Sequence, residues 1–248
     1  MEKFIAKSEI SMQILKSAGL SANLPVNTLI FGQSGVGKKL LAHEILPNAV
    51  VFEAIEFESL LNKKLVSTDG YPQLILYHLD QVLNIEEFLE NLKGVKLVAT
   101  AKEKSTRFNQ QFAVKIEIPP LKEREEDLKE LTDQYVKEAC NIFDKKTIYD
   151  TKNLEIDLTT NGISLKNSIY KSILKYTIKE DEIKNILEYY FTEQLKENAT
   201  YKDLMSIFEV PILKSANKLF KSQVQMANQL DINRITLRKK LDIYQEEL

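Results

Sequence analysis

A glycine-rich segment between an apolar run and a helix-like run is the feature that most constrains the fold of this chain. It follows Asn27–Phe31 (NTLIF) and consists of Gly32, Gln33, Ser34, Gly35, Val36, Gly37, Lys38 and Lys39. Glycines at this spacing let the backbone curl around an anion with its N–H groups pointing inward, and the start of a helix adds a favourable dipole. Lys38 would reach the terminal phosphates, whereas Lys39 stands where the common pattern has a Ser or Thr that holds Mg²⁺. The segment predicts an ATP site and gives little support for Mg²⁺; the alternative is a glycine turn that merely joins strand to helix.

Five apolar runs divide the first 120 residues. They are Asn27–Phe31, Ala49–Ala54, Gln73–His78, Val95–Thr100 and Ala113–Ile118. Their apolarity is continuous rather than alternating, which is typical of parallel strands covered on both faces. Helix-like segments, Lys38–Ile45 and Ile85–Leu92, lie between them. The pattern predicts a three-layer α/β domain with a parallel sheet.

The character of the chain changes at Pro119 and Pro120, which no sheet strand can pass. From Glu123 onward the sequence is helix-like, with a less regular stretch at Asp144–Gly162 that ends in the turn signal Asn161-Gly162. Helices are expected at Leu165–Tyr176 and Glu180–Lys196. We therefore predict a P-loop domain at 1–138, a helical lid-like subdomain at 139–200 and an all-α domain at 201–248.

The all-α domain has the pattern helix, helix, tight turn, helix. The predicted helices are Met205–Leu219, Gln223–Leu230 and Arg234–Tyr244, with Ser222 as an N-cap and Asp231–Asn233 as the turn. Helical spacing predicts that these apolar side chains are buried: Ile207, Val210, Ile212, Leu219, Val224, Ala227, Leu230, Ile235, Leu237, Leu241 and Ile243.

Basic residues concentrate in this C-terminal segment, although the formal net charge of the chain is −2. Residues 211–244 contain seven Lys and Arg against two Asp. A short helix, a tight turn and a basic second helix form the geometry that enters the major groove of DNA. The residues expected to contact double-stranded DNA are Ser222, Asn233, Arg234, Thr236, Arg238, Lys239 and Lys240. The alternative is a solvated basic helix that makes no such contact.

Several classes of protein are excluded by composition. A single cysteine, Cys140, rules out an internal disulfide framework and fits a reducing compartment. No run approaches the roughly 18 apolar residues that span a bilayer, and the N-terminus lacks the apolar core of a secretory signal. We expect a cytoplasmic protein that does not contact membranes.

Three motifs carry a resemblance to bacterial enhancer-binding proteins of the NtrC class. GQSGVGKK is similar to the GESGTGKE of their AAA+ domain, which interacts with sigma-54, and IPPLKEREEDL at Ile118–Leu128 is similar to their LPPLRERREDI. INRITLRKKL at Ile232–Leu241 resembles the helix-turn-helix that this class shares with the Fis protein. The resemblance implies a homodimer through the C-terminal domain, two recognition helices about 34 Å apart, and a contact with RNA polymerase.

The departures from this family bear on catalysis. Tyr77 and His78 occupy the positions of the family's Asp-Glu pair, and Asp80 would serve only if the register slipped by three residues. Ala101 replaces the sensor asparagine. Near the positions of the family's arginine fingers, this sequence has Lys104, Arg107 and Gln110. No arginine lies between Arg124 and Arg234, so the later sensor arginine has no counterpart.

The sigma-54 loop, GAFTGA, is also missing, because Glu56–Pro72 is too short to hold it. We assign no catalytic residue and no metal ligand. The sequence predicts a transcription regulator with a degenerate AAA+ domain and no receiver domain. A working ATPase that remodels a transcription complex, and a nucleoid-type or adaptor protein, are the alternatives.

Overall fold

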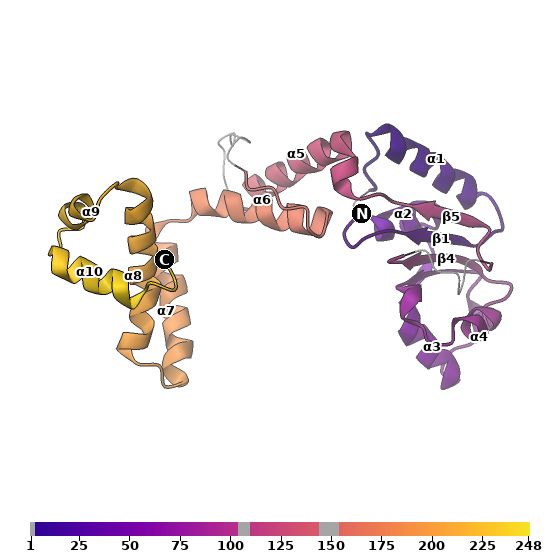
Figure 1. Ribbon diagram of the computed structural model, residues 1–248. Coiled ribbons are helices and arrows are strands. Elements are labelled where there is room, and N and C mark those ends of the chain that lie inside the picture. Colours follow the sequence, from indigo (N-terminus) through magenta and orange to yellow (C-terminus); the bar gives the residue numbers. More distant parts are fainter. Residues whose placement is uncertain (1–2, 104–109, 144–153) are drawn as a thin grey trace. The chain divides into compact units, whose positions relative to one another are not determined.

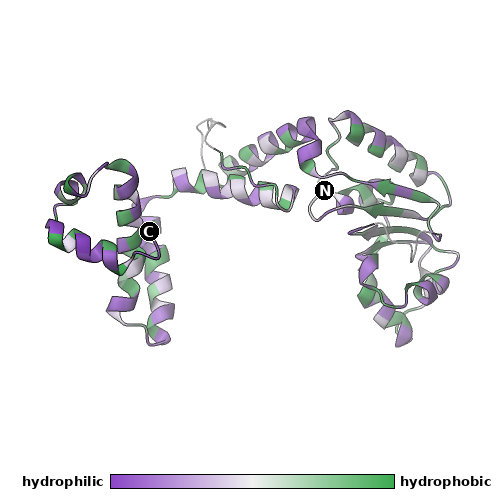
Figure 2. Cartoon of the chain, in the orientation of Figure 1, coloured by the Kyte–Doolittle hydropathy of each residue, from purple (hydrophilic) through white to green (hydrophobic). Residues whose placement is uncertain are grey.

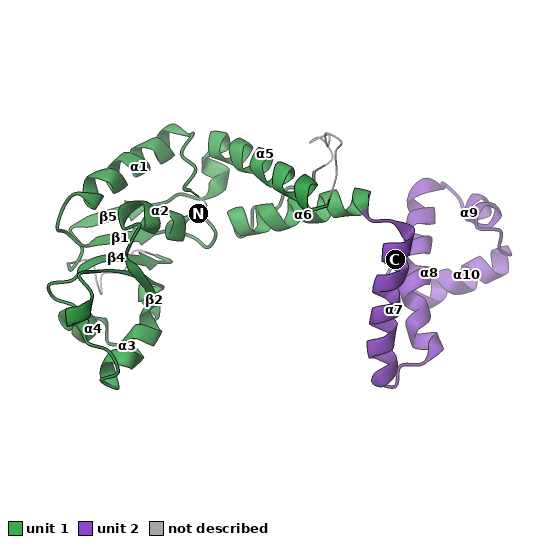
Figure 3. Ribbon diagram, turned by 180° about the vertical axis from the view of Figure 1, so that it is seen from behind, with its two compact units in different colours: residues 1–177 green, residues 178–248 purple. Residues whose placement is uncertain are grey.

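The structure is a computed structural model that describes residues 3–103, 110–143 and 154–248. The chain divides into two compact units, Met1–Thr177 and Ile178–Leu248, shown in different colours in Figure 3. The elements of each unit are labelled in Figure 1. None of the helices in these ranges has both the length and the apolarity needed to cross a bilayer.

A five-stranded parallel sheet forms the core of the first unit. Its strands are β1 (Thr28–Phe31), β2 (Val50–Glu53), β3 (Gln73–Tyr77), β4 (Lys96–Ala101) and β5 (Val114–Glu117), in the order β2-β3-β4-β1-β5. Every neighbouring pair is parallel. Each strand lies in one of the predicted apolar runs, which confirms the α/β class with a parallel sheet.

The sheet is covered on both faces, so the domain has three layers (Figure 1). Because successive side chains of a strand point to opposite faces, Leu29 and Leu74 face one layer, and Ile30 and Ile75 face the other. The first layer contains α3 (Ala54–Asn62), η2 (Leu79–Gln81) and α4 (Ile85–Glu90); the second contains α1 (Glu9–Ala22) and α2 (Lys38–Ile45). The predictions for α2 and α4 are confirmed, whereas α1 and α3 were not predicted.

A helical pair completes the first unit. After Pro119 and Pro120 end β5, η3 (Leu121–Glu123) leads into α5 (Glu125–Ile142), which packs on α6 (Gly162–Thr177). Leu121, Ala139 and three buried side chains of α6 form their common core. The chain thus divides into compact units after Thr177, which lies inside the segment predicted as 139–200. The three predicted segments stay predictions as functional domains.

The second unit is all-helical: α7 (Glu180–Lys196), α8 (Tyr201–Leu219), α9 (Gln223–Gln229) and α10 (Arg234–Ile243). Its buried core consists of Leu213, Ala216, Met226, Ala227 and Leu237. Part of the predicted core is therefore wrong, because these predicted side chains are exposed: Ile212, Leu219, Val224, Ile235 and Ile243. The reason is that α8 buries Val210, Leu213 and Ala216, and of these three only Val210 was predicted to be buried. Apolar residues consequently remain on outer faces of these helices (Figure 2).

Candidate functional site

The glycine-rich loop leaves β1 and enters α2 in the predicted strand–loop–helix order. Gly32, Gly35 and Gly37 have φ values of 145°, 75° and 105°, which residues with a Cβ rarely adopt. Gly37 is the left-handed N-cap of α2. The glycines thus give the loop the path that a phosphate-binding loop requires, with the N-terminus of α2 directed at its concave side.

The start of α6 holds this loop from outside the sheet domain. Asn161 donates from Nδ2 to the Ser34 carbonyl at 2.9 Å, and the Gly162 N–H donates to the Gly35 carbonyl at 3.1 Å. A Cβ on Gly35 would lie 2.0 Å from the carbonyl oxygen of Thr160. The sequence predicted only a turn at Asn161-Gly162; nothing local indicated that this turn contacts the loop.

Lys38 lies at the first position of α2 and folds back on the loop. Its ammonium group donates to the Gly32 carbonyl and, at 2.7 Å, to the Gln33 carbonyl. Burial lowers the pKa of Lys38, the charge of Asp80 opposes this effect, and the charge of Lys102 adds to it. Lys38 is therefore positioned at the loop as the sequence predicts.

The ends of β2, β3 and β4 bring a second group of side chains to the same edge of the sheet. Glu53 lies opposite Tyr77 in the register, and its two carboxylate oxygens contact Lys39 Nζ at 3.4 Å and His78 Nδ1 at 2.6 Å. The His78 N–H donates to Thr100 Oγ1 at 3.1 Å. Lys39 Nζ also lies 4.2 Å from the centre of the Tyr77 ring.

These contacts lower the pKa of Glu53. Burial alone would raise it, but the hydrogen bond and charge of His78, together with the nearby Lys39, outweigh that effect. Sequence reasoning missed Glu53 because it lies within an apolar run. Its position at the carboxyl end of a parallel strand, where open α/β sheets bind ligands, is the signal that could have found it.

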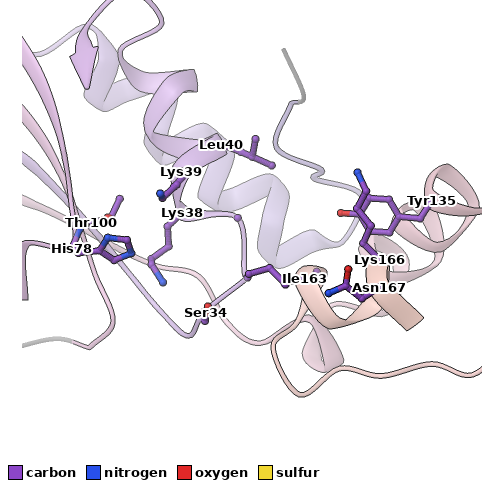
Figure 4. A pocket seen from close by; sticks show the side chains of 13 residues that line it. Ser34, Lys38, Lys39, Leu40, His78, Thr100, Tyr135, Ile163, Lys166 and Asn167 are labelled. Carbon is purple, nitrogen blue, oxygen red and sulfur yellow. Dashed lines mark hydrogen bonds between the residues drawn. The ribbon is translucent and has the colours of Figure 1, made fainter. Parts of the chain in front are cut away.

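A cavity of about 500 Å³ joins the loop to α6. Figure 4 shows Lys38, Lys39, His78 and Thr100 reaching it from the sheet domain, and Tyr135, Ile163, Lys166 and Asn167 reaching it from α5 and α6. The described residues that line it are Ser34, Gly35, Gly37, Lys38, Lys39, Leu40, His78, Thr100, Tyr135, Gly162, Ile163, Lys166 and Asn167. Three lysines, Lys38, Lys39 and Lys166, are among these residues, and the ammonium group of Lys166 pairs with Glu138 at 2.9 Å.

Several residues are expected at the positions of the resembled family's catalytic groups, and the structure places most of them. β3 ends at Tyr77, and the phenol of Tyr77 contacts His43 Nε2 at 3.0 Å. Asp80 lies beyond the strand, exposed, on η2. Ala101 is completely buried at the end of β4. Gln110 is exposed, whereas Lys104 and Arg107 lie outside the described residues.

The second predicted site, at the C-terminus, consists of two short helices, α9 and α10, joined by residues 230–233. Ser222 caps α9 through a hydrogen bond from the Gln225 N–H at 3.3 Å, as predicted. Asp231 is left-handed at φ 50°, and the Ile232 N–H donates to the Ala227 carbonyl at 3.1 Å, which closes the end of α9. Asn233 caps α10 by accepting from the Ile235 N–H at 2.8 Å. The tight turn is therefore stabilised by a backbone hydrogen bond at the end of α9 and by the Asn233 cap at the start of α10.

Most of the side chains predicted to contact DNA are exposed. Leu237 anchors α10 in the core, while Arg234, Thr236, Arg238 and Lys239 face solvent. Lys240 differs from them, because its ammonium group pairs with Glu209 of α8. The hydrogen bond from Lys240 lowers the pKa of Glu209, burial opposes this shift, and a hydrogen bond with Tyr244 adds to it.

No family model matches the sequence, and no curated protein matches it. The chain is similar to crystal structures of NtrX from Brucella abortus in complex with ATP and in complex with ADP, each with a TM-score of 0.55 and 17% identity. These comparisons cover 98% and 97% of this chain and 69% and 68% of NtrX. A third NtrX structure gives a TM-score of 0.57 at 16% identity, covering 96% of this chain and 68% of NtrX. At this identity the likeness shows the fold alone, an α/β domain with a parallel sheet followed by helices.

Proposed function

We propose that the protein is a DNA-binding regulator of transcription whose P-loop domain binds ATP as a regulatory input without hydrolysing it. The observation that carries the first part is the exposed, basic start of α10 behind a capped tight turn. Its ten residues form a helix about 15 Å long, which fits into a major groove.

The side chains of α10 differ in how well they can bind DNA. Arg234 and Arg238 are exposed and one helical turn apart, so both can reach the same strand of DNA. Arginine presents a fixed fork of donors to phosphates and to guanine. The pairing of Lys240 with Glu209 makes Lys240 the weakest member of the predicted set.

Dimerisation through the second unit would give the two half-sites that this geometry uses. Its support is the apolar surface on α7 and α8, including exposed Ile186, Tyr189 and Ile212. Two copies joined there would place two α10 helices about one turn of DNA, 34 Å, apart. A dimer bound to DNA beside a promoter would also be placed to contact RNA polymerase.

Three observations support nucleotide binding. The loop has left-handed glycines at the required positions, Lys38 lies at its base, and three lysines line the adjoining cavity. NtrX, which shares the fold, has been crystallised with ATP and with ADP. Loss of hydrolysis follows from the end of β3, where Tyr77 and His78 replace the acids that would hold a metal and polarise water.

DNA binding is tested by fluorescence anisotropy with labelled fragments of the chromosome from which the gene comes. We expect binding that weakens steeply with salt, and a loss of roughly tenfold or more in Arg234→Ala/Arg238→Ala. The control is Lys184→Ala/Lys202→Ala, which removes the same charge from α7 and α8. Equal affinity of the α10 variant and the control would refute this site.

A working ATPase is the second candidate, favoured by the closeness of Asp80 to Lys38 that is evident in the pKa of Lys38. Phosphate release decides between the two candidates. We expect the same background rate in wild type, Lys38→Ala and Asp80→Asn. A wild-type rate well above both variants would show that Asp80 acts in hydrolysis.

A further inference from the structure

We propose that the loop cavity binds the triphosphate without a divalent cation, because Lys38 and Lys39 supply the positive charge that a metal supplies in other P-loops. This inference rests on the nucleotide binding proposed above. It assigns Lys39 to the phosphates and predicts an affinity that does not depend on Mg²⁺.

The donors at the cavity do not fit Mg²⁺. This ion takes oxygen ligands in octahedral geometry. Many P-loops supply one from a Ser or Thr after the loop lysine and another from an acid at a strand end, although the resembled GESGTGKE has Glu in place of that Ser or Thr. Lys39 and His78 stand near those places here. An ammonium group has three donors and no acceptor, so Lys39 cannot be a ligand.

Among the described residues, none of those that line the cavity carries a carboxylate. Glu53 is close by, but Lys39 engages one of its oxygens and His78 the other. Within the described ranges, no group of three or more His, Cys, Asp or Glu side chains could hold a metal. Glu53 is therefore engaged in fixing two side chains of the site rather than in offering oxygens to it.

Electrostatics favours an anion over a metal at this position. Lys38 and Lys39 both line the cavity, and a doubly charged cation beside their ammonium groups would be repelled. Lys39 is held in place by Glu53 on one side and by the face of the Tyr77 ring on the other. Lysine binds phosphate as a point charge, so an ordered Lys39 can neutralise part of a triphosphate directly.

The competing possibility is that Asp80 holds a metal ion that binds together with the nucleotide. Its charge acts on Lys38, yet it is exposed on η2 and does not line the cavity. If a metal does bind with the nucleotide, Asp80 is the acid that would hold it. The experiment therefore needs an Asp80 variant beside the Lys39 variant.

The test is calorimetric titration of ATP into the full chain, once with excess EDTA and once with Mg²⁺. We expect the two affinities of wild type to agree within about twofold, and Lys38→Ala to lose binding in both buffers. Wild-type affinity at least about tenfold higher with Mg²⁺ would overturn the inference alone. Absence of binding in both buffers by a folded protein would instead overturn nucleotide binding itself, and this inference with it.

Lys39→Ser restores the usual hydroxyl and removes the ammonium group. We expect its affinity in EDTA to fall about tenfold, the loss typical of one charged hydrogen bond, and Mg²⁺ to recover part of it. Lys16→Ser, on the exposed face of α1, removes the same charge and should leave both affinities unchanged. An unchanged affinity of Lys39→Ser in EDTA would remove Lys39 from the site.

Asp80→Asn should behave as wild type in both buffers. A preference for Mg²⁺ in wild type that disappears in this variant would assign a metal to Asp80 and refute the cation-free site. Thermal unfolding of each variant shows that the comparison is made on folded protein.

Discussion

Gly35 shows how one residue of the loop depends on a distant segment. The sequence predicted that the loop glycines let the backbone curl around an anion, and Gly35 has a left-handed φ of 75°. The sequence could not show that the Thr160 carbonyl lies where a side chain would be, since 125 residues separate the two. Backbone conformation and close approach therefore demand glycine here for two independent reasons.

Gly35→Ala should lower the free energy of unfolding of the first unit by about 2 kcal/mol or more, because it combines backbone strain with a clash. Chemical denaturation measures this effect. Gly19→Ala is the matched control, because a Cβ at Gly19 of α1 meets nothing within 4 Å. A helical glycine replaced by alanine should stabilise by about 0.5–1 kcal/mol, so the two variants should move in opposite directions.

Asp127 joins the N-terminal segment to α5. Its completely buried carboxylate accepts from the backbone N–H groups of Lys7 and Ser8 at 2.6 and 2.8 Å, and from the hydroxyls of Ser8 and Ser11. Arg124 Nη1 lies 3.3 Å away, and its side chain is only 3% exposed. Asp127→Ala should cost about 3–5 kcal/mol in denaturant unfolding, because it leaves a buried guanidinium without its counter-charge.

An exposed ion pair next to this network provides the contrast. Lys7 and Glu130 are 3.8 Å apart with most of the lysine side chain in solvent. Glu130→Gln should therefore change stability by less than about 1 kcal/mol. Equal effects of the two substitutions would show that Asp127 does not hold the fold in this way.

At the scale of elements, the helices that the sequence missed share a cause. Two of the four buried residues of α1, Ser11 and Ser21, are polar, so the helix has a weak apolar period. Helix α3 begins directly after β2, at Ala54, with no turn residue or side-chain cap to mark its start. Both helices are stabilised by the sheet that they cover, and that contribution is invisible in a local pattern.

The pairing of α8 with α10 predicts a dependence on pH. The pKa of Glu209 is lowered from 4.5 in the folded protein, so its pairing with Lys240 stabilises the second unit fully above that value. This stabilisation is lost as the pH falls below 4.5 through the folded pKa. Glu209→Gln should lower the stability at pH 7 by about 1 kcal/mol and flatten the decline below pH 4.5, as followed by thermal unfolding.

Glu193 of α7 provides the control for this effect. It pairs with Lys196 at 2.7 Å on an exposed surface. Glu193→Gln should leave both the melting temperature and its pH profile nearly unchanged. A profile of Glu209→Gln identical to that of Glu193→Gln would argue against the pairing with α10.

At the scale of the whole molecule, the two units have separate hydrophobic cores. We expect calorimetry to show two transitions. Leu237 is fully buried in α10. Leu237→Ala should therefore lower the free energy of unfolding in one transition by about 2–5 kcal/mol and leave the other transition unchanged. A single transition that shifts as a whole would mean that the units unfold together.

Dimerisation through the second unit predicts which transition depends on concentration. Folded dimers are stabilised by mass action, so the transition lowered by Leu237→Ala should rise with protein concentration. Ile186→Asp, on the exposed face of α7, should abolish this rise. Light scattering provides the mass, and a monomer at all concentrations would contradict the proposed dimer.

The sequence by itself determined the features that local chemistry specifies. Continuous apolar runs marked all five strands, and glycines and Lys38 marked the loop. Ser222 marked the start of α9, and Asp231–Asn233 marked the turn before α10. Each of these depends on residues a few positions apart, and such short-range preferences can be read in order along the chain.

Only the tertiary structure decided which of these residues meet. Strand order placed Glu53 beside His78, the fold of α6 placed Asn161 on the loop, and the packing of α8 joined Glu209 to Lys240. These contacts join segments that are 25, 127 and 31 residues apart. No local preference encodes such pairs, because their free energy comes from burial and charge that exist only once the chain has closed on itself.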